Sequence, residues 1–70
     1  MNSEVQRLKE AYPVGTMVEL ISMEDPYAPV EGGTKGRVTH VDDIGTIHVD
    51  WETGSTLGLI CGVDRFKVIG

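Results

Sequence analysis

The sequence predicts a small, mainly β domain that is preceded by a short α-helix, and three observations lead to this expectation. Two runs rich in β-branched residues flank a segment with the composition of a hairpin turn, residues 42–45. A second turn of similar composition follows at residues 51–55. Apolar residues also recur at helical spacing in residues 3–12, before any strand-like alternation begins.

The two turns predict one register for three consecutive strands. Gly45 can adopt the positive φ that a type I turn followed by a bulge requires, so residues 43–45 are expected to form the first loop. The resulting pairs are Asp42 with Thr46, Val41 with Ile47, Ile47 with Leu59, and Val49 with Leu57. Both turns then place the same apolar set on one face of the sheet: Val41, Ile47, Val49, Trp51, Leu57 and Leu59.

Residues 3–12 are predicted to form the helix, with Ser3 as its N-cap and Pro13 ending it. Its apolar residues at helical spacing are Val5, Leu8 and Tyr12. Two turns of helix are marginal alone in water, so this stripe must cover an open end of the domain, bind a partner or contact a second copy. Leu8 and Tyr12 are therefore candidate partner-binding residues.

The first strand is expected within residues 14–22, with Val18 and Leu20 pointing inward. The long segment 23–33 contains two prolines and two glycines and is expected to be a loop. Long loops in compact domains often bind ligands, which makes three of its residues candidate partner contacts: Asp25, Tyr27 and Val30. The alternative for Tyr27 is that its ring packs back onto its own loop.

The second strand is expected to begin at Lys35 and to contain an irregularity. Gly36 and Val38 face inward in simple alternation, yet Val41 must face inward as well. A β-bulge near Thr39 resolves the conflict, and such bulges bend strands in strongly curved sheets.

The C-terminal part is expected to contain a single helical turn or a tight loop at residues 60–65 and a last strand at 66–69, in which Phe66 and Val68 complete the core. Five short strands, a long first loop, two tight hairpins and a turn before the last strand outline an SH3-like five-stranded barrel. The predicted organisation is thus a helical segment, residues 1–13, and a barrel, residues 14–70.

Several motifs are similar to those of known families. GTKGRV at 33–38 resembles the KOW motif, and VDWETGST at 49–56 resembles a stretch of mind-bomb/HERC-type SH3-like domains. Residues 12–69 more closely resemble a bacterial and phage family known as domain of unknown function 4314, through YPVGT, ELISM, DPYAPV, GTKG, DDIGTI and GLI. This resemblance implies the fold, a bacterial or phage origin and frequent association with mobile elements, but no activity. Cys61 stands where that family often has proline.

Length and charge narrow the possible functions. A chain of 70 residues forms one domain and buries only about 60% of its unfolded surface. Eleven acidic against six basic residues give a net charge of −5, which repels phosphate backbones. A single cysteine, no charged-then-apolar leader and no long apolar run lead us to expect a cytoplasmic location and no membrane contact.

Candidate chemistry is sparse. The predicted register places His40 opposite His48 with Asp42 and Asp50 on the same outward face, a donor set that suits zinc. Two histidines on a sheet face more often only fill cross-strand positions, so no metal or other cofactor is expected. Asp42 and the adjacent Asp43 point to opposite sides of a hairpin and suit the turn itself, so we expect no enzyme activity.

The function expected from the sequence is a non-catalytic protein-interaction or accessory module of a bacterial, phage or mobile-element system. It is expected to act as a monomer or as a homodimer formed through the helix. The alternative is a KOW-like barrel that binds RNA or DNA through a basic stripe of four residues: Lys35, Arg37, Arg65 and Lys67.

Overall fold

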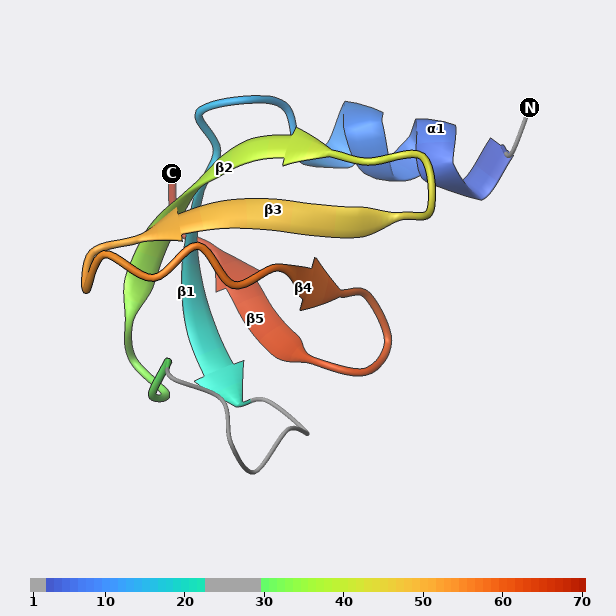
Figure 1. Ribbon diagram of the computed structural model, residues 1–70. Coiled ribbons are helices and arrows are strands. Elements are labelled where there is room, and N and C mark those ends of the chain that lie inside the picture. Colours follow the sequence, from blue (N-terminus) through green and yellow to red (C-terminus); the bar gives the residue numbers. More distant parts are fainter. Residues whose placement is uncertain (1–2, 23–29) are drawn as a thin grey trace.

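The structure is a computed structural model that describes residues 3–22 and 30–70 (Figure 1). Its elements in chain order are the helix α1 (Ser3–Ala11) and the strands β1 (Met17–Ser22), β2 (Lys35–Val41), β3 (Thr46–Trp51), β4 (Leu59–Ile60) and β5 (Arg65–Val68). The strands form one antiparallel sheet in the order β4-β3-β2-β1-β5. This confirms a mainly β fold with a short N-terminal helix. Within the described ranges, no helix is both long and apolar enough to cross a membrane.

The sheet is curled but does not close through a ladder between its end strands, β4 and β5. In the described residues, the link between these two ends is an isolated bridge between Cys61 and Asp64. The side chain of Asp64 also accepts a hydrogen bond of 2.9 Å from the N–H of Ile60, at the end of β4. The five predicted strands are therefore present, while the predicted barrel is an open sheet.

The first hairpin has the predicted register. Val41 pairs with Ile47, and His40 with His48. Asp42 determines the turn, because its Oδ1 accepts the N–H of Ile44 at 3.1 Å and that of Thr46 at 2.9 Å. Gly45 has the expected positive φ of 90°.

Two further register predictions have different outcomes. The pairing of β2 with β3 shifts between Val38 and His40, which confirms the bulge expected near Thr39. The predicted pair of Ile47 with Leu59 is present, but the β3–β4 ladder does not extend to the predicted pair of Val49 with Leu57. The Leu57 carbonyl instead accepts the indole N–H of Trp51 at 2.8 Å.

The core lies on the concave face of the sheet and under α1. Its buried residues are Val18, Leu20, Val30, Val38, Val41, Ile47, Val49, Trp51 and Leu59. Val5 of the helix is buried, and the half-buried Leu8 and Tyr12 pack against the core. The ring of Tyr12 lies 5.4 Å from that of Phe66 between centroids. The helix stripe therefore covers the domain's own core beside the β2–β3 hairpin (Figure 1).

The prediction that Phe66 and Val68 complete the core is correct for only one of them. Phe66 is half-buried and packs on the core, whereas Val68 is 53% exposed. Val68 pairs with the fully buried Val18 and so shares its face of the sheet. Among the described residues, β5 is an end strand, so Val68 lies at the edge of this face and is left partly open to solvent.

Gly36 provides a test of the packing between β2 and β3. A Cβ at this position would lie 2.5 Å from Cγ1 of Val49 and 2.8 Å from Cε3 of Trp51, both buried. We expect Gly36→Ala to lower the free energy of unfolding by about 1–3 kcal/mol through overpacking, measured by urea denaturation. Thr56→Ala, at an exposed position, should change it by less than about 0.5 kcal/mol. Equal urea midpoints for Gly36→Ala and Thr56→Ala would show that the space beside Gly36 accommodates a Cβ.

Candidate functional site

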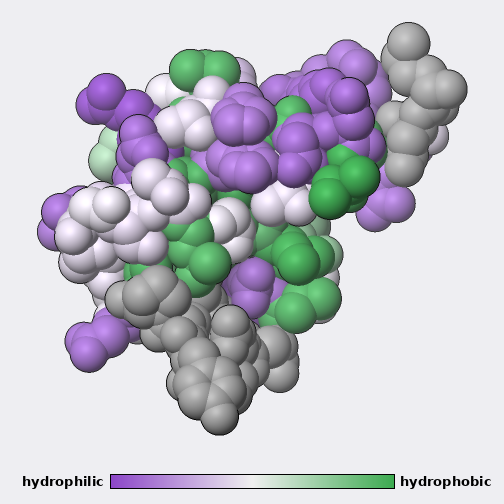
Figure 2. Space-filling model, in the orientation of Figure 1, coloured by the Kyte–Doolittle hydropathy of each residue, from purple (hydrophilic) through white to green (hydrophobic). Residues whose placement is uncertain are grey.

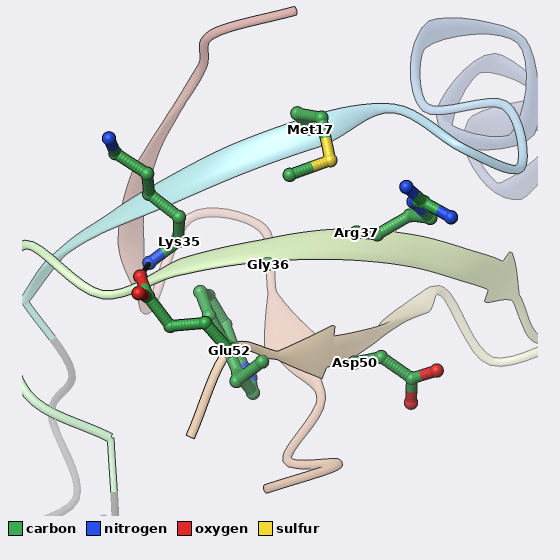
Figure 3. Close-up of a pocket in the computed structure, with 7 residues that line it drawn as sticks. Met17, Lys35, Gly36, Arg37, Asp50 and Glu52 are labelled. Atoms are coloured by element: carbon green, nitrogen blue, oxygen red, sulfur yellow. Dashed lines mark hydrogen bonds between the residues drawn. The ribbon is translucent and has the colours of Figure 1, made fainter. Parts of the chain in front are cut away.

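A shallow groove of about 440 Å³ lies on the outer face of β1, β2 and β3 (Figure 3). We call it the outer groove. Its lining residues are Met17, Lys35, Gly36, Arg37, Asp50, Trp51 and Glu52. Four of these seven residues carry a charged side chain, two of each sign.

Alternation along the strands explains why these residues share a face. Val18 points into the core, so Met17 before it points outward on β1. The sheet pairs Met17 with Arg37, and Arg37 in turn with Asp50. Residues that pair across antiparallel strands lie on the same face, and these three therefore form one row across the sheet. Lys35 is two residues from Arg37 and lies on the same face.

The floor of the outer groove is formed by Gly36 and Trp51, which pair directly across β2 and β3. Trp51 is only 3% exposed, and its indole N–H donates to the carbonyl of Leu57 at 2.8 Å. Any side chain at Gly36 would collide with this ring. The floor is therefore the backbone of Gly36 and Trp51, and the fixed indole ring lies beneath it. This rigid floor supports the charged residues of the rim.

The two ends of the outer groove each carry one cation and one carboxylate. At one end, the backbone N–H of Lys35 donates to Oε2 of Glu52 at 2.6 Å, and the N–H of Glu52 donates to the carbonyl of Lys35 at 2.9 Å. At the other end, Arg37 lies opposite Asp50 on the neighbouring strand. Figure 3 shows the Met17 side chain between Lys35 and Arg37, on the β1 side of the groove. Thioether side chains adapt readily to a contacting surface.

The structure places the four predicted basic residues on one outer face, but with acids among them. Lys35 and Arg37 lie on β2, and Arg65 and Lys67 lie on β5, with β1 between the two strands. Glu19 on β1 pairs with Lys35 on one side and with Lys67 on the other, and its carboxylate is 3.5 Å from Nζ of Lys67. The predicted basic stripe is therefore a surface of mixed charge.

The sequence reasoning placed Asp50 on the outward face, but only beside the two histidines and not with the cations of the outer groove, although a signal was present. The predicted hairpin register already paired residues of β2 and β3, and continuing it through the bulge would have placed Asp50 opposite Arg37. Glu52 gave no comparable signal, because it lies after the end of β3. Its position depends on two hydrogen bonds with the backbone of Lys35, one from its own N–H and one to its carboxylate.

The histidine pair also has the predicted placement. The rings of His40 and His48 stack with centroids 4.2 Å apart and planes 6° from parallel. Nε2 of His48 lies 2.8 Å from Oδ2 of Asp42. This hydrogen bond, together with the N–H of Thr46, lowers the pKa of Asp42 below its ordinary value of 3.8. Among the described residues, no group of three or more His, Cys, Asp or Glu side chains is arranged to hold a metal ion.

The remaining predicted site residues fall in three places. Asp25 and Tyr27 lie outside the described residues. Val30 is buried in the core, which leaves it little surface for a partner. Leu8, on α1, and Tyr12, just after it, are half-buried and pack against the core.

Comparison with known proteins identifies a family and no activity. The family model described as "Domain of unknown function (DUF4314)" matches residues 1–69. No curated protein and no solved structure matches the chain significantly.

The hydrogen bonds to Asp42 predict a dependence of stability on acid pH. Its pKa in the folded protein is lowered, so the stabilisation is complete above the unfolded pKa, near 3.8, and is lost as the pH falls through the folded pKa. We expect the free energy of unfolding to decrease more steeply in the wild type than in Asp42→Asn between about pH 5 and pH 2. Urea unfolding across this range measures both slopes. Identical slopes would mean that Asp42 contributes nothing to acid unfolding.

Proposed function

Because the chain belongs to the DUF4314 family, whose description gives no activity, we propose its function from its surface: it is a non-catalytic protein-binding module. A segment of its partner lies in the outer groove. The observation that supports this proposal is the alternation of charge around Met17, with a cation and a carboxylate at each end.

This arrangement fits a polypeptide better than a phosphate backbone. A polypeptide can present acidic groups to Lys35 and Arg37 and basic groups to Asp50 and Glu52, and such complementarity gives specificity. A nucleic acid would bring its phosphates close to the two carboxylates as well as to the two cations, which weakens the attraction. Methionine and arginine are also enriched in protein interfaces.

The biological setting belongs to the same proposal. The resemblance of residues 12–69 to bacterial and phage proteins suggests a cytoplasmic accessory role in a bacterium, a phage or a mobile element. The SH3-like outline expected from the sequence is part of this proposal. Its five antiparallel strands and two hairpin turns are present, in an open sheet.

A second candidate function, the binding of RNA or DNA, is favoured by one observation. Four of the six lysine and arginine residues of the chain lie on the outer face of β2 and β5. In this alternative, Lys35, Arg37, Arg65 and Lys67 contact phosphates, and Glu19 and Asp50 lower the affinity. The two candidates differ in their response to nuclease and to salt.

The double variant Lys35→Glu/Arg37→Glu tests the proposal. It should reduce capture of a discrete partner protein from an extract of the source organism roughly tenfold, because both cations of the outer groove are reversed. Quantitative mass spectrometry of the captured proteins measures this effect, with circular dichroism to verify folding. Gln6→Glu/Arg7→Glu/Thr56→Glu is the matched control, since it changes the net charge by the same −4 at exposed positions that line neither this groove nor the ion pair of Lys9 with Asp43.

Two outcomes would contradict the protein-binding proposal. One is equal loss of capture in the test variant and the charge-matched control, which would indicate a response to net charge alone. The other is capture that disappears after nuclease treatment. Direct binding to a mixed nucleic-acid pool that weakens linearly with the logarithm of salt concentration, with a slope reduced by about two in Lys35→Glu/Arg37→Glu, would establish the alternative.

A further inference from the structure

A second groove lies between α1, the tip of the β2–β3 hairpin and the end of β4, with a volume of about 200 Å³. We call it the helix groove. Its lining residues are Glu4, Val5, Leu8, Ile44, Gly45, Ile60 and Cys61. It shares no lining residue with the outer groove. Figure 2 shows apolar side chains gathered on this side of the molecule, below the helix.

The helix groove exposes large apolar side chains that the fold does not require there. Ile44 is 86% exposed at the hairpin tip, and Ile60 is 51% exposed on β4. The turn depends on Asp42 and Gly45, and Ile44 contributes only its backbone N–H to Asp42. A contiguous apolar patch around a groove is typical of a docking surface.

Contacts within the protein connect the elements that form the walls of the helix groove. Nζ of Lys9 lies 3.1 Å from Oδ1 of Asp43 and connects the helix to the hairpin. On the other wall, the side chain of Asp64 accepts the N–H of Ile60 at 2.9 Å. A preformed groove reduces the ordering cost of binding.

Carboxylates surround this apolar groove. Glu4 lines it, Asp64 is bonded to the backbone of Ile60, and the side chain of Asp43 is 98% exposed next to Ile44. The charge of Asp43 is paired with that of Lys9, so the acidic rim consists of Glu4 and Asp64. The chain as a whole carries a net charge of −5. An apolar floor with an acidic rim is complementary to a segment that is apolar on one side and basic on the other.

We propose that the helix groove binds a basic amphipathic helix of a partner protein. Apolar residues of that helix, spaced three or four apart, contact Ile44, Ile60 and Leu8, and its lysine or arginine residues face Glu4 and Asp64. This site is separate from the outer groove and does not depend on the function proposed there. A domain that uses both grooves holds two partner segments at once.

A model peptide tests this proposal. The probe is an amphipathic helix of about 18 residues, five turns, made of leucine and lysine, titrated into the ¹⁵N-labelled full chain. We expect saturable shifts of the amides of Val5, Leu8, Ile44, Gly45 and Ile60. A peptide of the same pattern with glutamate in place of lysine should not bind, and a scrambled leucine–lysine peptide without an apolar face should bind at least tenfold more weakly.

Paired variants separate docking from general charge attraction. Ile44→Asn removes the most exposed apolar side chain of the groove without changing the net charge, and it should weaken binding of the leucine–lysine peptide at least tenfold. Val14→Asn, at an exposed valine outside the groove, should leave the affinity unchanged. Thermal unfolding of both variants verifies that the fold is retained.

Four results would overturn the proposal: no saturable shift, shifts spread over the acidic surface, shifts confined to the outer groove, or equal affinities of the wild type and Ile44→Asn. Concentration-dependent shifts of the same amides without peptide would instead assign the groove to a second copy of the chain. Because Lys35 and Arg37 are unchanged in these experiments, none of these outcomes decides the proposal for the outer groove.

Discussion

The contact between Gly36 and the indole ring of Trp51 connects the core to the outer groove. Gly36 and Trp51 pair across β2 and β3, and the indole ring is almost completely buried. The N–H of the ring donates to the carbonyl of Leu57 and so holds the segment that follows β3. On the outer side of the same strands, the contact sets the positions from which Lys35 and Arg37 project. One packing constraint therefore supports both the stability of the sheet and the arrangement of charge on its surface.

Much of the fold could be predicted because its signals are local. The Asp42 side chain and the positive φ of Gly45 determine the first turn within a few residues, and the spacing of Val38 and Val41 already required a bulge. The open sheet and the exposure of Val68 could not be predicted in this way. They depend on which strand lies at the end of the sheet, a property of the whole topology.

The site was predicted only in part, for a similar reason. Sequence reasoning grouped Lys35 and Arg37 with two cations of β5, but their acidic neighbours Asp50 and Glu52 depend on pairing across the sheet and on backbone contacts after β3. The helix groove was not predicted at all. It exists because α1 docks beside the hairpin tip, which brings Glu4, Val5 and Leu8 next to Ile44 and the end of β4.

Zero-length cross-linking with a carbodiimide in extract of the source organism tests the central claim, a partner protein in the outer groove, most directly. The reagent joins lysine amines to carboxylates that are in contact. The account predicts that one partner segment becomes linked both to Lys35, through its own carboxylates, and to Asp50 or Glu52, through its own lysines. Cross-links to partner proteins that avoid these three residues and occur only elsewhere on the domain would contradict it.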